Sequence, residues 1–244
     1  MRARCIPLLL CAAALLLTGC AGKPLQEPAE PPVPEVSDTP AESAAEPPKD
    51  ERPLIVCMGD SITAGYGVYT NDEMFSAYLQ DLLGDRARVI AYGTPGETLH
   101  EASVYSSPAL NAEADIVLLQ FGTNDASPSL FRADAFRESA EALLDTHIDA
   151  LGAENVAFLL PPCVYPAGGD IASFGMSAQK LDEVRAILTE ICAEKDVAVV
   201  DLCSATCDHP EWFPDGVHPN ADGNKAIAQA IYDTLFSESS PFRA

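Results

Sequence analysis

The sequence predicts an α/β domain, a three-layer sandwich in which helices cover both faces of a mostly parallel sheet of five strands. Three observations support this fold class. Short apolar runs alternate along the chain with longer segments that carry apolar residues at helical spacing. The short runs are apolar throughout, as in strands covered on both faces. Clusters of polar residues follow these runs, at the sheet edge where ligands bind in such folds.

The expected strands and helices alternate in the order that a parallel sheet requires. The expected strands are the apolar runs 54–58, 88–91, 115–120, 155–160 and 197–200. The expected helices are 72–83, 130–151, 177–194 and 222–236, in which apolar residues recur three and four positions apart. No internal repeat accompanies them.

The N-terminal residues 1–19 are predicted to be the signal peptide of a lipoprotein. Arg2 and Arg4 give a positive start, and residues 5–17 are apolar apart from one proline. This run is shorter than the roughly 20 residues that a membrane-spanning helix needs. The four residues that end in Cys20 (LTGC) resemble the lipobox of bacterial lipoproteins, which implies diacylation of its thiol. We therefore expect an exported protein, lipid-anchored to the outer face of a bacterial membrane; the alternative is an ordinary signal peptide cut elsewhere.

A tether is expected between this anchor and the folded domain. Residues 20–52 are rich in Pro, Glu and Ala and contain few large apolar side chains, so they cannot bury enough surface to become ordered. Residues 53–244 are then one domain. The whole chain has 14 basic and 37 acidic residues, a net charge of −23, which argues against a nucleic-acid partner because DNA and RNA are polyanions.

The cysteines and histidines do not predict a metal site. The four histidines lack zinc-type spacing, and the pair Cys203 and Cys207 has no second pair after it. Cys57 and Cys192 lie in apolar segments and are expected to be buried free thiols. Cys163, Cys203 and Cys207 are expected in loops, where a Cys203–Cys207 bridge or a bridge from either to Cys163 is compatible with an oxidising compartment.

Three polar clusters that follow strands carry the residue types of a serine hydrolase. They contain Ser61, Asn124 and the pair Asp215 and His218. A serine hydroxyl needs an adjacent base to become a nucleophile, and an imidazole can take its proton and pass it to the leaving group. A carboxylate on the other ring nitrogen orients the imidazole, and an amide can donate to the developing oxyanion. His218 is expected to be exposed on its loop and to contribute little to packing.

Each of these residues also has a purely structural interpretation. Ser61 could cap a helix, although the company of His218 and Asn124 favours the nucleophile. Asp125 is interpreted as a turn former, and Asp60 as an acceptor of backbone hydrogen bonds that shape the serine turn. His147 lies on an apolar helical stripe and is expected to be packed rather than to bind a ligand. Four aromatic residues are candidates either for the substrate pocket or for packing, namely Tyr165, Phe174, Trp212 and Phe213.

The three clusters together resemble the motif blocks of the SGNH/GDSL hydrolase family, in the right order over about residues 54–236. The blocks are 59–63 (GDSIT), 122–125 (GTND) and 215–219 (DGVHP). The resemblance implies a flavodoxin-like strand order of 2-1-3-4-5, a catalytic triad of Ser61, His218 and Asp215, and no cofactor. It also implies an oxyanion hole formed by the N–H groups of Ser61 and Gly96 with the amide of Asn124.

The second block of the family is matched on the segment that follows the second expected strand. It normally contributes a glycine N–H from a loop after the second strand, and residues 92–98 are expected to form that loop. Gly96 fits better than Gly93 because Glu97 and Thr98 follow it. The family often has an asparagine at the end of this strand, where Ala91 is expected here. Because that residue usually supports the loop rather than taking part in the chemistry, we expect the activity to be kept.

The predicted function is that of a serine esterase that hydrolyses O-acyl esters outside the cell, and it is expected to be a monomer. Its expected partners are an ester substrate, either an acylated glycan or a lipid, and the membrane that holds Cys20. One alternative is an O-acyltransferase that uses the same triad. Another is a binding lipoprotein that has lost catalysis, and a third is a phosphate-binding flavodoxin-like module.

Overall fold

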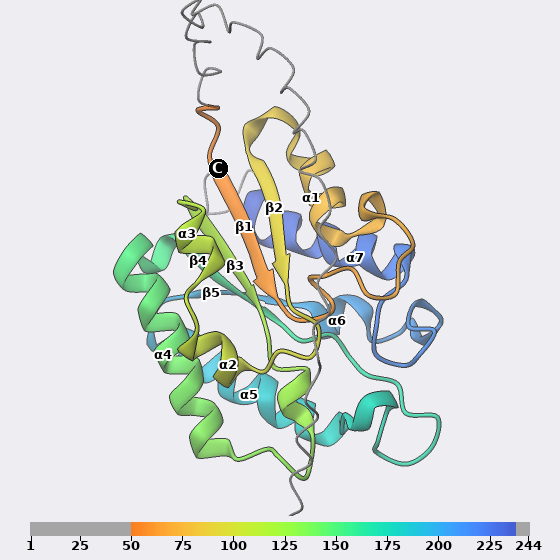
Figure 1. Ribbon diagram of the computed structural model, residues 1–244. Helices are drawn as coiled ribbons and strands as arrows, with labels where there is room; N and C mark the ends of the chain where they lie inside the picture. The colour runs from red at the N-terminus through yellow and green to blue at the C-terminus, as the bar shows by residue number, and fades with distance from the viewer. Residues whose placement is uncertain (1–49, 238–244) are drawn as a thin grey trace, which may run out of the picture. The chain divides into compact units, whose positions relative to one another are not determined.

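The fold is a five-stranded parallel sheet in the order β2-β1-β3-β4-β5 (Figure 1). The strands are β1 (Leu54–Gly59), β2 (Arg88–Gly93), β3 (Ile116–Gln120), β4 (Val156–Leu160) and β5 (Ala198–Asp201). The computed structural model describes residues 50–237, so the predicted signal peptide, Cys20 and nearly all of the predicted tether lie outside the described residues. Both the predicted fold class and the strand order implied by the family resemblance are confirmed.

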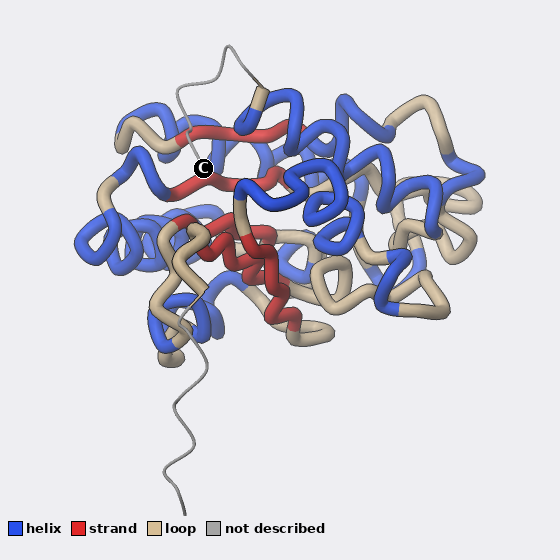
Figure 2. The backbone as a smooth tube through the Cα atoms, turned by 90° about the horizontal axis from the view of Figure 1, so that it is seen from above, coloured by secondary structure: helices blue, strands red, loops and turns tan. Residues whose placement is uncertain are grey.

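Helices cover both faces of this sheet (Figure 2). They are α1 (Phe75–Leu83), α2 (Leu99–Val104), α3 (Pro108–Asn111), α4 (Ala133–Leu151), α5 (Ala178–Glu194), α6 (Leu202–Thr206) and α7 (Ala221–Ile231), which continues as a π-helical turn, Tyr232–Phe236. One layer contains α1 and α7, which pack on each other, and the other contains α2, α4 and α5. No helix within residues 50–237 is both long and apolar enough to cross a membrane.

Each face of the sheet has its own hydrophobic core. Along β1, Val56 and Met58 point into the core under α4 and α5, and Ile55 and Cys57 point into the core under α1 and α7. Successive side chains of a strand point to opposite faces, so a strand that is buried on both sides is apolar at nearly every position. Cys57 and Cys192 are both buried free thiols, as the sequence predicted.

The structure differs from the sequence-based expectations mainly at the ends of elements and in short helices. The first long helix begins at Phe75 after a single 3-10 turn, and β2 runs two residues further than expected, to Gly93. Tyr92 and Gly93 therefore belong to the sheet rather than to a loop, and Ala91 does not end the strand. The helices α2, α3 and α6 were not predicted, because four to six residues are too few to show a helical stripe.

Candidate active site

Ser61, His218 and Asp215 form a continuous chain of hydrogen bonds at the carboxyl edge of the sheet. The Oγ atom of Ser61 lies 2.9 Å from Nε2 of His218, and Nδ1 of the same ring lies 2.7 Å from Oδ2 of Asp215. Ser61 follows β1, whereas the other two residues lie in the long loop between α6 and α7. The structure therefore brings together three residues that the sequence analysis selected, although 157 positions separate the serine from the histidine.

The turn that carries Ser61 is fixed from beneath by buried polar side chains. Asp60 accepts a hydrogen bond from the backbone N–H of Ile62 at 2.9 Å, which confirms the role that the sequence predicted for it. Gln120, the last residue of β3, accepts from the Thr63 hydroxyl at 3.0 Å and donates to the Asp60 carboxyl at 3.4 Å. Gln120 was missed by the sequence analysis, although a glutamine at the end of an otherwise apolar strand was a usable signal.

Asp60 is fully buried beside the reacting serine. Burial raises the pKa of its carboxyl to about 7, and the hydrogen bonds from the Ile62 N–H and the Gln120 amide only partly oppose this shift. A carboxyl group in this state changes its charge close to neutral pH. The Asp60 carboxyl accepts a hydrogen bond within the turn that carries Ser61. A change in its charge therefore takes place next to the nucleophile.

The turn that carries His218 is organised by the carboxylate of Asp215. Oδ1 of Asp215 accepts from the backbone N–H groups of Val217 and His218 at 2.9 and 2.8 Å. Burial alone would raise the pKa of this carboxyl, but the hydrogen bonds from His218 and Val217 outweigh burial and lower it. Gly216 has φ +82°, and a Cβ atom there would lie 2.5 Å from the carbonyl oxygen of Tyr165, so this turn requires glycine.

A buried asparagine of α7 holds the segment that follows His218. The Nδ2 group of Asn224 donates to the carbonyl of Pro219 at 2.8 Å, and its Oδ1 accepts from the backbone N–H of Phe75 at 2.9 Å. Asn224 was also missed by the sequence analysis. The expectation that His218 is exposed is wrong, because its position against Ser61 and beneath two aromatic rings leaves it only 5% exposed.

Asn124 lies after β3 and Gly96 lies after β2, on two loops that a hydrogen bond joins. The Nδ2 group of Asn124 donates to the backbone carbonyl of Glu97 at 2.9 Å, which links the loop after β3 to the loop after β2. Asp125 strengthens the same link by accepting from the N–H of Leu99, at 3.0 Å, where α2 begins. Its expected role as a turn former is thus too narrow, since it joins two loops.

The structure assigns Gly93 a packing role. A Cβ atom at Gly93 would lie 2.1 Å from the backbone nitrogen of Ala64, so the end of β2 approaches the serine loop more closely than any other residue type would allow. Gly96, by contrast, has φ +83° and open space around the position of a Cβ atom. Of these two glycines, Gly96 is the one exposed on the loop beside the site.

Two exposed aromatic rings flank the imidazole of His218. The ring centroid of Tyr66 lies 5.3 Å from that of His218, and the ring centroid of Phe174 lies 5.2 Å from it. Tyr66 was not singled out from the sequence. Phe213 is buried and packs against Tyr165 with centroids 5.0 Å apart.

Trp212 and His209 form a separate pair on the surface. Their rings stack with centroids 3.7 Å apart, and Nδ1 of His209 lies 2.8 Å from the carboxylate of Glu211. Among the described residues, the aromatic rings against the imidazole of His218 are those of Tyr66 and Phe174, and Trp212 is not one of them. Trp212 therefore stacks on His209 and not on the ring of His218. Of the two interpretations of Phe213, packing beneath the loop agrees with its burial.

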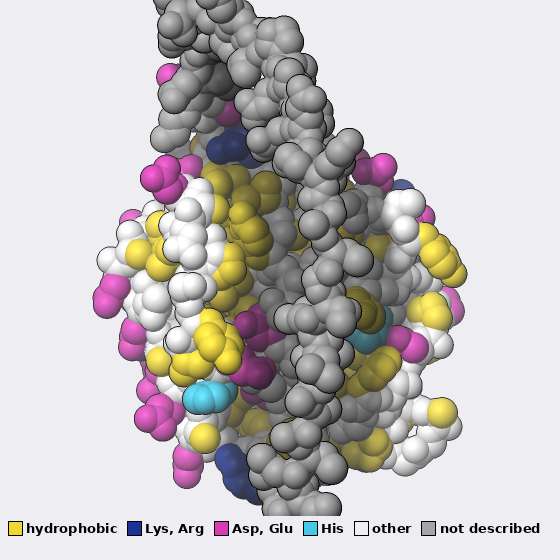
Figure 3. Space-filling model, in the orientation of Figure 1, with side chains coloured by type: hydrophobic (Ala, Val, Ile, Leu, Met, Phe, Trp, Pro, Cys, Tyr) yellow, Lys and Arg dark blue, Asp and Glu magenta, His cyan; other side chains and the backbone are white. Residues whose placement is uncertain are grey.

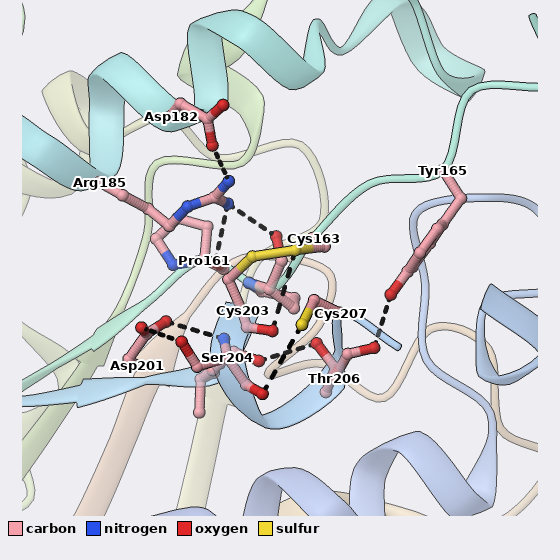
Figure 4. The surroundings of a disulfide bond; sticks show 12 residues. Pro161, Cys163, Tyr165, Asp182, Arg185, Asp201, Cys203, Ser204, Thr206 and Cys207 are labelled. Atoms are coloured by element: carbon pink, nitrogen blue, oxygen red, sulfur yellow. Dashed lines mark hydrogen bonds and ion pairs between the residues drawn. A yellow bond between two sulfur atoms is a disulfide. The ribbon is translucent and has the colours of Figure 1, made fainter. Parts of the chain in front are cut away.

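A disulfide bond fixes the base of the loop that carries Phe174. Cys163 is bonded to Cys203, one of the pairings left open by the sequence, whereas Cys207 is an exposed free thiol (Figure 4). Cys203 was expected to lie in a loop, but it lies inside α6. Tyr165 continues the attachment, because its hydroxyl donates to the carbonyl of Thr206 at 2.6 Å.

Two open cavities border the site. One of about 300 Å³ lies beside Asn124 and is lined mostly by apolar groups, including those of Leu130, Phe131 and Phe136. Another of about 500 Å³ lies beside Asp215 and is lined by the segment around Ile171. Figure 3 shows hydrophobic side chains gathered over the α2 and α4 side of the face in view, with acidic side chains around its outer border.

The remaining candidate side chains are structural. His147 is fully buried, with its ring nitrogens 2.8 Å from the Ser107 hydroxyl and 2.8 Å from the Leu143 carbonyl, and burial lowers its pKa. It is a packed histidine, as predicted. His100 contacts the Ser139 hydroxyl at 3.2 Å. Within residues 50–237 no group of three or more His, Cys, Asp or Glu side chains is arranged to hold a metal ion.

Comparison with known proteins agrees with this architecture. The model of the GDSL-like lipase/acylhydrolase family matches residues 57–226. An acetylxylan esterase from Xylanibacter ruminicola is 26% identical over 207 residues, which are 75% of this chain and 43% of that protein. The chain thus spans less than half the length of this curated relative.

Solved structures show the same fold. A lipase/acylhydrolase from Enterococcus faecalis is 26% identical with a TM-score of 0.63, covering 74% of this chain and 94% of that one. A carbohydrate acetylesterase family member from Sinorhizobium meliloti is 22% identical with a TM-score of 0.61, covering 74% and 96%. With the family model spanning most of the domain, the chain belongs to the GDSL-like lipase/acylhydrolase family of carboxylic ester hydrolases.

Proposed function

We propose that the protein is a serine esterase that removes acyl groups, acetyl in particular, from glycans outside the cell. The observation that carries the proposal is the unbroken hydrogen-bond chain from Ser61 through His218 to Asp215. A nucleophile, a base and an orienting carboxylate in that order are the parts that acyl transfer through a serine requires.

In the proposed reaction the Oγ atom of Ser61 attacks the carbonyl carbon of the ester while Nε2 of His218 takes its proton. The tetrahedral intermediate collapses when the same imidazole gives that proton to the leaving alcohol oxygen, which leaves an acyl-enzyme. Water, activated by His218, then releases the acid and restores the serine. Asp215 holds Nδ1 of the ring protonated throughout and stabilises the imidazolium.

The oxyanion is proposed to bind the N–H groups of Ser61 and Gly96 and the amide of Asn124. Within residues 50–237 the backbone N–H groups of Ser61 and Gly96 have no acceptor. The amide nitrogen of Asn124 has two hydrogens, and its bond to Glu97 occupies only one of them. Three donors aimed at one oxygen are what stabilisation of a developing negative charge needs.

The glycan ester is favoured by two considerations. The relative from Xylanibacter ruminicola is named an acetylxylan esterase, and the fold is shared with a carbohydrate acetylesterase family member. The net charge of −23 also disfavours approach to anionic lipid surfaces. A lipid ester remains the second class of substrate to be assayed.

Export and lipid anchoring through Cys20 are proposed on the sequence alone, from the positive start, the apolar run and the LTGC motif. The expected outcome is that the full-length protein incorporates labelled palmitate in a bacterial host and fractionates with membranes. Incorporation that persists in a Cys20→Ser variant would contradict this assignment.

A fluorophosphonate probe tests the catalytic assignment. The wild-type protein should be labelled and should release acetate from p-nitrophenyl acetate, and Ser61→Ala should abolish labelling and lower kcat at least about 10⁴-fold. Ser103→Ala is the matched control, because Ser103 is half-buried on α2 and its hydroxyl only donates to the His100 carbonyl. A folded wild-type protein that is neither labelled nor active would favour a binding lipoprotein, and acetate that moves to a sugar hydroxyl would favour an acyltransferase.

A further inference from the structure

We propose that Tyr66 and Phe174 form a subsite that stacks on the sugar ring of the leaving alcohol, so that the enzyme selects esters carried by pyranose units. The inference rests on the proposed function and names the recognition element for its substrate. It starts from the position that the leaving oxygen must take during the reaction.

His218 must deliver a proton to that oxygen, so the oxygen has to approach Nε2 to within about 3 Å. The rings of Tyr66 and Phe174 have their centroids 5.3 and 5.2 Å from the centroid of the same imidazole. Any group attached to the leaving oxygen therefore lies next to these two rings.

Both rings are available to a ligand. Tyr66 is 54% exposed and Phe174 is 67% exposed, although each is in contact with a histidine that is almost completely buried. An aromatic side chain that served only to pack would bury its faces, since the free energy of packing comes from area removed from water. Exposed aromatic faces that converge on a reacting group are typical of a binding surface.

The backbone of Phe174 supplies an independent observation. Its φ and ψ are +60° and +13°, a left-handed conformation that a bulky residue rarely adopts. Strain of this kind persists where the surroundings impose it, and it concentrates at ligand-binding segments. Here the segment is held at both ends, because Tyr165 N–H donates to the Gly216 carbonyl at 2.7 Å and Ser177 N–H donates to the Ala126 carbonyl at 3.0 Å.

Tyr66 is positioned by the serine turn itself. Its backbone N–H donates to the carbonyl of Ser61 at 2.9 Å, so the ring moves together with the nucleophile. The two rings come from different loops, one after β1 and one after β4, and are tilted by 45° and 70° to the imidazole plane. They offer separate flat faces rather than an enclosing tunnel.

A pyranose ring suits such faces better than an acyclic alcohol does. The axial C–H groups of a pyranose form a flat apolar face with partial positive charge, which is complementary to the negative face of an aromatic ring. Glycerol and simple alkyl alcohols present no comparable face. The chemistry therefore points to a neutral sugar ring as the leaving alcohol.

The test compares kcat/KM for an acetylated xylo-oligosaccharide with kcat/KM for triacetin, an acetate ester of a ringless polyol. Phe174→Asn and Tyr66→Ala should each lower the ratio of sugar to triacetin roughly three- to tenfold, the range expected for one aromatic contact. The ratio cancels any general effect on His218. Asparagine tolerates the left-handed conformation, so Phe174→Asn removes the ring without unfolding the loop.

Two further variants separate ring recognition from a structural effect. Phe174→Tyr keeps an aromatic face and should have the same ratio of kcat/KM for the two esters as the wild type. Tyr69→Ala is the matched control, because Tyr69 is fully exposed on the loop of Tyr66 and makes no contact with His218 among the described residues. A ratio that stays unchanged in Phe174→Asn and Tyr66→Ala would overturn the proposal, while hydrolysis of both esters would leave the esterase function standing.

A binding measurement does not depend on turnover. In the Ser61→Ala background, the dissociation constant of the acetylated xylo-oligosaccharide, measured by calorimetry, should rise by a similar factor when Phe174→Asn is added. An unchanged dissociation constant would contradict the subsite. If the wild-type protein hydrolysed neither ester and binding still depended on Phe174, the subsite would be supported and the esterase function would fail.

Discussion

Replacing Asn124 by alanine is expected to slow the reaction without preventing binding of the substrate. Nδ2 of Asn124 has two hydrogens, one of which is used at 2.9 Å to the carbonyl of Glu97. The other is the proposed donor to the oxyanion. Loss of one such donor costs about 2.7–4 kcal/mol of transition-state stabilisation, which lowers kcat by roughly 10²–10³-fold.

The variant also loses the bond that joins the loops after β2 and β3. A bond of this kind contributes about 1 kcal/mol to the free energy of unfolding, because the Glu97 carbonyl is half-exposed and can bind water instead. Asp125→Ala is the control for this effect. It removes the carboxylate that accepts from the Leu99 N–H and loosens the same connection, but it leaves the Asn124 amide in place.

The assay is steady-state hydrolysis of p-nitrophenyl acetate, with urea unfolding measured in parallel. Asn124→Ala should lower kcat with little change in KM, since the lost bond is made only in the transition state. Asp125→Ala should lower kcat by less than about tenfold, because it removes no donor to the oxyanion. The reasoning is refuted if Asn124→Ala retains more than a tenth of wild-type kcat, or if both variants lose the same amount.

Two further predictions concern stability. Burial raises the pKa of Asp60 to about 7, so between about pH 4 and pH 7 the unfolded chain ionises this group while the folded protein keeps it protonated. The free energy of unfolding of the wild type, relative to that of Asp60→Asn, should therefore be highest below pH 4 and fall by at most about 4 kcal/mol as the pH rises to 7. Urea denaturation at several pH values measures this difference. A difference in the free energy of unfolding that does not change with pH would contradict the raised pKa. Reduction of the bond between Cys163 and Cys203, which are 40 positions apart, should lower the free energy of unfolding by about 4 kcal/mol and Tm by roughly 10 °C. Calorimetry in a Cys207→Ser background avoids exchange with that thiol, and a Tm insensitive to reductant would show that the bond does not stabilise the fold.

The sheet could be predicted from the sequence because its signals are local. A strand buried on both faces is apolar at nearly every position, and β1, β3 and β4 are buried along their whole lengths, with Gln120 as the polar last residue of β3. The long helices α4 and α5 each carry several turns of apolar stripe. The helix α2 has only six residues, and its one sequence signal is the capping box formed by Thr98 and Glu101.

The reacting residues could be predicted for a different reason. Ser61 and Asn124 each follow a strand, and the carboxyl ends of parallel strands share one edge of the sheet. The supporting residues that hold these reacting residues in place could not be predicted from the sequence. The bond from Thr63 to Gln120 joins positions 57 apart, and the bond from Phe75 to Asn224 joins positions 149 apart. Nothing in the local spacing records such pairs, since the tertiary fold alone decides which buried groups meet.

The same limit applied to the cysteines. Three of them were compatible with a bridge, and spacing favoured none, because a disulfide depends on how closely the two Cα atoms approach in space. The fold brings Cys163 and Cys203 to a Cα–Cα distance of 4.8 Å and leaves Cys207 exposed. The pairing of Tyr66 and Phe174 around His218 could not be predicted for the same reason, since the two residues lie in loops more than a hundred residues apart.

The supporting residues explain how loops can hold a site rigid enough for catalysis. The serine turn is bonded to β3 through Gln120, and the histidine turn is bonded to α1 through Asn224. Both amides are fully buried and have their partners within the protein, so water does not compete for them. The 2.9 Å contact between Ser61 and His218 is therefore set by the sheet and by the helix layer that contains α1 and α7. Because a misplacement of about 1 Å can cost a hundredfold in rate, residues that never touch the substrate control the reaction through this contact.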